Sequence, residues 1–240
     1  MKTLLCFLAG VMALVSCSSS DDGNNPVLLE KMIQTSSGGT ITTLRATYDG
    51  NRISEIISND GFVSHFTYTG DLITKREYKS GETLLLTELY QYDNNQRLAL
   101  YLRLQHNENQ GRKEVYLHAD DGTILMTAYE GDLVSQENII GYATITFLDN
   151  GEVGTIAHFG VDRTYTYDSK NNPFRNIAGY SKISWVNAAA SGILHNITSE
   201  SFDGTAGTTT SYTYNDQGYP VQGVKAYSGG GEAITDYIYY

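Results

Sequence analysis

A tyrosine followed by a short polar turn and an apolar residue recurs along most of this chain. The clearest copies are "FTYTGDLI", around Tyr68, and "TAYEGDLV", around Tyr129. Side chains alternate between the two faces of a strand, so Phe66 and Tyr68 share one face and the intervening threonine takes the other. The Gly-Asp pair supplies the positive φ of a tight reversal, and the apolar residue begins the returning strand. Each copy predicts a β-hairpin, and the aromatic anchors of the copies are Tyr48, Tyr68, Tyr92, Tyr129, Phe147, Tyr167, Tyr214 and Tyr239.

The spacing of these anchors predicts a repeat architecture. Successive anchors are 20, 24, 37, 18, 20, 47 and 25 residues apart. The two large steps are close to double steps, and "VYLHADDGTI" around Tyr116 fills the first of them with a degraded copy. Periods of this length are typical of chains built from one repeated supersecondary unit.

The number of turns predicts a wide antiparallel sheet. Turn signals recur about every ten to twelve residues, which predicts roughly 16 to 18 strands in an all-β meander. A sheet of that width twists and curls, and closure removes its exposed edges. We therefore expect residues 27–240 to form a single β-repeat domain, a closed or nearly closed up-and-down barrel. An open, spiralled sheet is the alternative.

The first residues indicate export and a lipid anchor. Residues 1–16 have the positive start and short apolar run of a signal peptide. The run ends in "LVSC", which resembles the bacterial lipobox and implies acylation of Cys17; an ordinary signal peptide with an incidental cysteine is the alternative. Residues 17–26 then form a flexible, lipidated tether. Its residues 20–22, "SDD", are similar to the acidic export tags of Bacteroidota lipoproteins, which implies an outer-membrane location with the domain exposed at the cell surface.

The hairpin copies also resemble known repeats. An aromatic-x-Tyr-Asp segment, a Gly or Asn turn and then Arg-Leu is similar to the YD-repeats of Rhs-type proteins, and Arg97-Leu98 keeps the last pair while Arg52-Ile53 is near it. With the lipobox, "YDSKNNPF" at residues 167–174 resembles a family of Bacteroidota lipoproteins of about this length. That resemblance implies a porin-like β-barrel. Rhs shells are far larger than this chain, so no encapsulating role is expected.

The repeat breaks at residues 175–200, which contain the chain's one tryptophan, Trp185. A long loop, or a short helix inserted at "WVNAAASGIL", would explain the break. Functional surfaces often lie on loops, so Trp185 is a candidate ligand-binding residue. Packing in the core is the alternative, since Ile183 and Val186 flank it.

Charge and motifs exclude several function classes. The formal net charge is −11 and no cluster of Lys and Arg is present, so nucleic acid is not an expected partner. Catalytic motifs are absent, the five histidines are scattered, and we expect no catalytic residue, no metal and no cofactor. Charged residues in "LITKREYK" argue against a barrel that spans the membrane. The sequence therefore favours a non-enzymatic, lipid-anchored envelope protein that binds a glycan or peptide or acts as a scaffold. A structural or adhesive protein is the alternative, and a glycan-active enzyme is favoured less.

Overall fold

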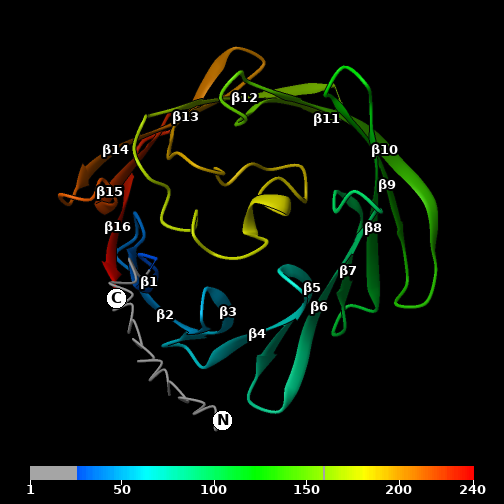
Figure 1. Ribbon diagram of the computed structural model, residues 1–240, viewed down its shortest axis with the longest axis horizontal. Helices are drawn as coiled ribbons and strands as arrows, with labels where there is room; N and C mark the ends of the chain where they lie inside the picture. Colours follow the sequence, from blue (N-terminus) through cyan, green and yellow to red (C-terminus); the bar gives the residue numbers. More distant parts are fainter. Residues whose placement is uncertain (1–25, 159) are drawn as a thin grey trace, which may run out of the picture.

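The structure is a computed structural model, and it describes residues 26–158 and 160–240 (Figure 1). The predicted signal peptide (residues 1–16), the predicted lipidation site Cys17 and the tether up to residue 25 lie outside the described residues.

Sixteen antiparallel strands of the described chain form one closed up-and-down barrel, in which each strand pairs with its sequence neighbours. The barrel closes where β1 pairs with β16 as well as with β2, and Met32 lies opposite both Tyr237 and Leu44. The predicted closed barrel is confirmed and the open sheet is not formed. All of its strands lie within residues 26–240. They are β1 (Leu29–Thr35), β2 (Ile41–Asp49), β3 (Arg52–Ser58), β4 (Phe62–Thr69), β5 (Leu72–Ser80), β6 (Thr83–Tyr92), β7 (Leu98–Gln105), β8 (Gln110–His118), β9 (Ile124–Gly131), β10 (Gln136–Phe147), β11 (Val153–His158), β12 (Val161–Tyr167), β13 (Ile197–Phe202), β14 (Thr205–Tyr214), β15 (Pro220–Tyr227) and β16 (Glu232–Tyr239).

Seven of the eight predicted anchors are the last or second-last residues of even-numbered strands, at one rim of the barrel, the anchor rim. Neighbouring strands run in opposite directions, so the ends of all even-numbered strands meet at the same rim. Tyr129 lies apart from the others, within β9, where the Lys113 ammonium is 4.5 Å from its ring centroid. The seven are Tyr48, Tyr68, Tyr92, Phe147, Tyr167, Tyr214 and Tyr239.

Five of the anchor hydroxyls bond to the backbone where the preceding odd-numbered strand begins. The Tyr92 hydroxyl donates to the carbonyl of Ile73 at 2.7 Å, and the Tyr68 hydroxyl accepts from the N–H of Ile53 at 3.1 Å. A partly buried ring with a satisfied hydroxyl suits tyrosine better than phenylalanine. The same donation to a carbonyl joins Tyr48 to Leu29, Tyr167 to Val153 and Tyr239 to Pro220, at 2.8, 2.8 and 2.9 Å.

A β-bulge beside each of these seven anchors curves the sheet. Thr47 pairs with Glu55 and Tyr48 with Ile53, so Ser54 is an extra residue on β3. The other six anchors have the same shift in register beside them. Bulges bend a strand and increase its twist, and repeated bulges help a wide sheet to close.

Residues 168–196 connect β12 to β13 and fold into the barrel; we call them the inner loop. Figure 1 shows them, in yellow and light orange, inside the ring of strands. The predicted long loop is confirmed, but a helix at "WVNAAASGIL" is not formed, because Asn187 and Ala188 have φ of +59° and +51°, which no right-handed helix allows. Because β12 to β14 are sheet neighbours, the 47-residue step is one hairpin period plus this loop.

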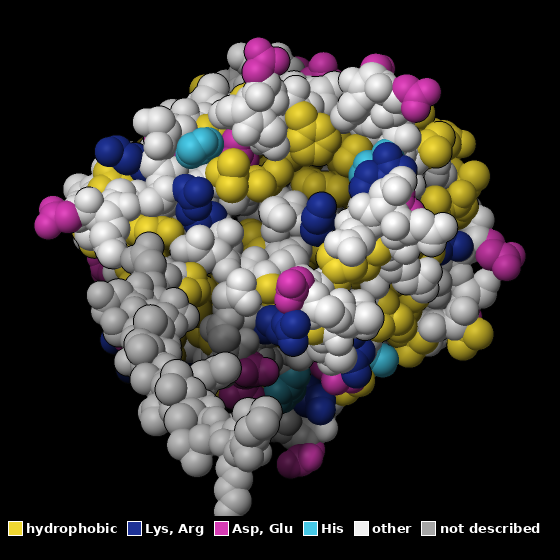
Figure 2. Space-filling view, in the orientation of Figure 1, with side chains coloured by type: hydrophobic (Ala, Val, Ile, Leu, Met, Phe, Trp, Pro, Cys, Tyr) yellow, Lys and Arg dark blue, Asp and Glu magenta, His cyan; other side chains and the backbone are white. Residues whose placement is uncertain are grey.

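The only helix among the described residues is the single 3-10 turn η1 (Tyr180–Lys182) in the inner loop. None of them therefore forms a helix long and apolar enough to cross a membrane. In the space-filling view down the barrel, side chains and backbone occupy the middle of the ring (Figure 2).

Polar side chains cover much of the outer face of the barrel. In the second half of β14 the exposed residues are Thr209, Ser211 and Thr213, and on β5 Lys75 and Glu77 form an ion pair of 3.2 Å. A lipid-facing strand would carry an apolar residue at these alternate positions. An apolar patch lies on β8 and β9, where Val115, Leu117 and Leu125 are 38%, 65% and 44% exposed, and the neighbouring β10 exposes Ile139 and Tyr142 to 49% and 64%.

Candidate binding sites in the barrel lumen

A buried carboxylate holds the end of the inner loop. Glu152 lies in the β10–β11 turn with 0% of its surface exposed. It accepts the backbone N–H groups of Ile193, Leu194 and His195 at 2.8, 2.6 and 2.7 Å. Charge-assisted hydrogen bonds are stronger than neutral ones, so these three bonds compensate the burial of the carboxylate.

Two further charged side chains from the barrel wall contact the middle of the inner loop. Glu114 on β8 accepts the N–H of Asn187 at 3.0 Å and the hydroxyl of Tyr116. Burial raises the pKa of Glu114, because it disfavours the charged form. Arg163 on β12 donates to the carbonyl of Ala188 at 2.8 Å. The loop is therefore a fixed part of the lumen.

Trp185, the predicted ligand-binding candidate, packs in the core. It is 5% exposed, and its ring meets Tyr116 edge-on with centroids 4.8 Å apart and His118 at 6.4 Å. It lines neither of the two cavities described next. A ligand-binding role for Trp185 stays a prediction.

The inner loop and β12 to β16 enclose a cavity of about 210 Å³, which we call the polar cavity. Its wall includes Gly223, a buried glycine in the middle of β15. A Cβ atom there would lie 2.9 Å from the Tyr212 ring and 3.6 Å from the Tyr237 ring, so the two rings flank a position without a side chain. Hydroxyl, amide and charged groups make up most of the remaining wall: Asn172, Ser191, Asn196, Glu200, Thr208, Thr210, Lys225 and Thr235.

The charges of the polar cavity are unevenly paired. Glu200 forms an ion pair with Arg163 at 3.4 Å. Lys225 has no ion pair with any residue that the structure describes, and its ammonium lies 5.8 Å from the Tyr227 ring centroid. Burial raises the pKa of Tyr237 to about 12, so its hydroxyl stays protonated at neutral pH. The cavity thus offers hydroxyl donors, one cation and one paired anion.

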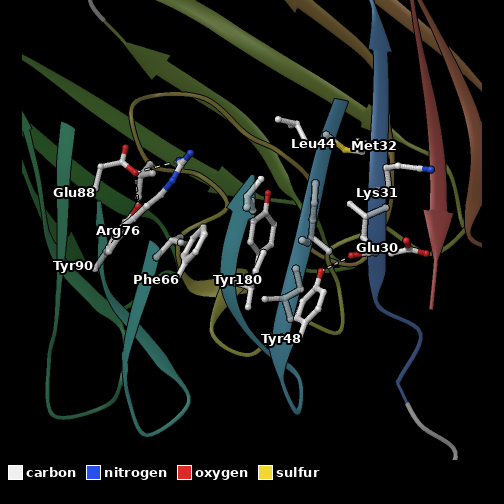
Figure 3. Close-up of a pocket in the computed structure, with 18 residues that line it drawn as sticks. Glu30, Lys31, Met32, Leu44, Tyr48, Phe66, Arg76, Glu88, Tyr90 and Tyr180 are labelled. Carbon is white, nitrogen blue, oxygen red and sulfur yellow. Dashed lines mark hydrogen bonds and ion pairs between the residues drawn. The ribbon is translucent and has the colours of Figure 1, made fainter. Parts of the chain in front are cut away.

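A second cavity, of about 290 Å³, lies between the inner loop and β1 to β6; we call it the apolar cavity (Figure 3). Phe174 of the inner loop lines both cavities. Aliphatic and aromatic side chains dominate the apolar cavity: Leu29, Met32, Leu44, Ala46, Tyr48, Ile53, Ile56, Phe66, Tyr90, Phe174, Ile177, Tyr180, Ile183 and Val186.

An ion pair marks one end of the apolar cavity, and Figure 3 shows it across from Tyr48 and Lys31. Arg76 and Glu88 are 3.3 Å apart. Glu88 is 8% exposed and also accepts the hydroxyls of Tyr101 and Tyr90, at 2.6 and 3.2 Å. Burial and the Glu88 charge raise the pKa of Tyr101 well above its usual value.

The sequence did not single out Glu152 or Gly223. Glu152 belongs to "LDNGE", whose Asp, Asn and Gly residues are typical of a turn, and its partners lie more than 40 residues further along the chain. Gly223 carried a usable signal, because a glycine inside an alternating strand often marks a close approach of other groups.

Comparison with known proteins gives structural matches only. No protein-family model matches the chain, and no curated protein matches its sequence. A porin-like protein from Bacteroides uniformis ATCC 8492 is 11% identical with a TM-score of 0.48, over 90% of this chain and 99% of that chain. A porin-like protein from Bacteroides vulgatus ATCC 8482 is 10% identical with a TM-score of 0.40, over the same shares. The closed barrel is established by the strand pairing of this chain itself, and the resemblance to YD-repeat lipoproteins stays a prediction.

Proposed function

We propose that this protein is a lipid-anchored envelope protein that binds a glycan in the polar cavity and catalyses no reaction. One observation carries the proposal: the rings of Tyr212 and Tyr237 flank the bare backbone of Gly223 inside a cavity walled by hydroxyl groups. A pyranose ring has apolar C–H faces and a rim of hydroxyls. An aromatic ring with a polar edge matches both features.

The chemistry of the walls favours a glycan over a peptide. Thr208, Thr210 and Thr235 line the cavity with hydroxyls that can both donate and accept, as sugar hydroxyls require. Lys225 adds a donor with three N–H groups, which suits the oxygens of a neutral or acidic sugar.

The single carboxylate of the polar cavity supports binding without catalysis. Glycoside hydrolysis generally uses two carboxyl groups that flank the scissile bond. Among the described residues that line the polar cavity, Glu200 is the one acid, and it is paired with Arg163.

Residues outside the barrel support the envelope location. The signal-like residues 1–16 and the lipobox-like "LVSC" ending at Cys17 predict export and acylation. A polar outer surface on β5 and β14 suits a barrel held at a membrane by a lipid rather than embedded in it.

A scaffold or adhesive role is the second candidate, and the apolar patch favours it. Val115, Leu117 and Leu125 are exposed side by side, since Leu117 and Leu125 are direct cross-strand partners. Exposed apolar patches commonly mark contact surfaces.

A glycan array followed by calorimetry on residues 26–240 tests the glycan proposal. We expect saturable binding of at least one glycan. Tyr237→Ala, which removes one flanking ring, is expected to weaken binding roughly tenfold, the size of one aromatic contact. Gly223→Val is expected to abolish binding, because its side chain would occupy the space beside both rings.

Gly229→Val is the matched control, because a Cβ atom at Gly229 meets nothing within 4 Å. It should bind like the unmodified protein. Absence of binding to every glycan on the array, or equal binding by Gly223→Val and Gly229→Val, would contradict a glycan site in the polar cavity.

A further inference from the structure

The apolar cavity is independent of the proposed glycan site and has a different chemistry. Its walls join two apolar surfaces, one from β1 to β4, with Leu44, Ile56 and Phe66, and one from the inner loop, with Ile177 and Val186. Unfilled apolar space lowers stability in proportion to its volume, so cores seldom retain it without use. About 290 Å³ is close to the lower limit of small-molecule pockets, roughly 300 Å³, which are mostly apolar with a few convergent polar groups.

The charged end of this cavity lies in a row of side chains with excess positive charge. In the strand register, Glu88 on β6 is opposite Arg76 on β5 and Arg103 on β7, and Arg103 is in turn opposite Arg112 on β8. Arg112 is in turn opposite Glu130 on β9, so three guanidinium groups face two carboxylates along this row. An additional anion lowers the electrostatic repulsion among them.

Arg76 retains hydrogen-bonding capacity toward an anion. Its Nε and Nη2 atoms donate to the Ser64 hydroxyl at 3.2 and 3.1 Å, and Nη1 donates to Glu88 at 3.3 Å. A guanidinium carries five N–H groups, so two N–H groups are not used by these bonds. Its centre also lies 5.6 Å from the Phe66 ring centroid, within the range of a cation–π interaction.

We propose that the apolar cavity binds a small apolar molecule with a single carboxylate, such as a medium-chain fatty acid. The chain lies between Ile56 of the barrel wall and Val186 of the inner loop, and the carboxylate accepts hydrogen bonds from Arg76. Figure 3 shows the line of apolar side chains that leads from Tyr48 past Tyr180 to Arg76.

Calorimetric titration of residues 26–240 with decanoate and with decanol, without detergent, tests this site. We expect one decanoate per barrel, bound about tenfold more tightly than decanol, because hydrogen bonds to a charged group are stronger than those to a hydroxyl. Equal affinities in the unmodified protein would overturn the assignment of the carboxylate to Arg76. Failure of both molecules to bind would overturn the site itself.

Two double variants distinguish the contribution of the Arg76–Glu88 charges to decanoate binding from that of the apolar walls. Arg76→Gln/Glu88→Gln removes both charges together and keeps an acceptor for the tyrosine hydroxyls, so decanoate should lose its advantage over decanol. Lys75→Gln/Glu77→Gln removes the neighbouring outward-facing pair on the same strand, and the advantage should stay. An advantage that survives the first variant would contradict the proposal.

Ala46→Phe fills the cavity from β2, where Ala46 is 7% exposed, and should abolish binding of both molecules. A thermal melt shows whether the Ala46→Phe variant is folded. If it is not folded, the two double variants test the site without it. Gly223→Val should leave decanoate binding unchanged, so a failed glycan site and a failed apolar site give different results.

Discussion

Glu152→Ala is expected to lower the free energy of unfolding by about 3 to 5 kcal/mol, measured by urea denaturation of residues 26–240. The substitution leaves three backbone N–H groups of the inner loop, those of Ile193, Leu194 and His195, without their acceptor. It also opens a void at a position with 0% exposure. The expected loss is large because one carboxylate joins the barrel wall to a segment without a hydrogen-bonding ladder of its own.

Glu137→Ala is the control, since Glu137 is an exposed acid on β10. It should change the free energy of unfolding by less than about 0.5 kcal/mol. Glu152→Gln keeps one acceptor oxygen, so its free energy of unfolding should lie between those of Glu152→Ala and Glu137→Ala. Equal stability of Glu152→Ala and Glu137→Ala would show that the carboxylate does not hold the inner loop.

Tyr92→Ala is expected to cost about 3 kcal/mol, and Tyr92→Phe only about 1 kcal/mol. The ring packs against the main core cluster, whereas the hydroxyl makes one hydrogen bond, to the carbonyl of Ile73. Comparing the two variants in urea denaturation therefore separates the packing of an anchor from its hydroxyl bond.

Tyr142→Ala provides the reference for this pair, because Tyr142 is 64% exposed and ends no strand. We expect it to change stability by less than about 0.5 kcal/mol. If Tyr92→Ala also changed the free energy of unfolding by less than about 0.5 kcal/mol, the anchors would not stabilise the rim. If Tyr92→Phe lowered it as much as Tyr92→Ala, the hydroxyl bond would contribute more than the packing of the ring.

The hairpins and the barrel could be predicted because their causes are local. Alternation in "FTY" and the Gly-Asp turn after Tyr68 act within a few residues, and β4 and β5 form there as expected. Closure of the barrel then follows from the number of hairpins, because a wide sheet twists and its edge strands pair. No single long-range contact has to be known to predict it.

The interior could not be predicted, because it depends on distant contacts. The path of the inner loop is set by Glu152 and Glu114, which lie 41 and 73 residues from their partners Ile193 and Asn187. Trp185 was visible as the chain's one tryptophan, but only the three-dimensional structure brings it against Tyr116. The two cavities likewise depend on which strands face the loop.

Hydrogen–deuterium exchange at the amides of the inner loop tests most directly whether residues 168–196 fold inside the barrel. The amides of Asn187, Ile193, Leu194 and His195 are bonded to carboxylates of the barrel wall, so they should exchange as slowly as amides within the strands. Exchange of these four amides at the rate of an unprotected surface loop would contradict an occupied lumen and, with it, both cavities.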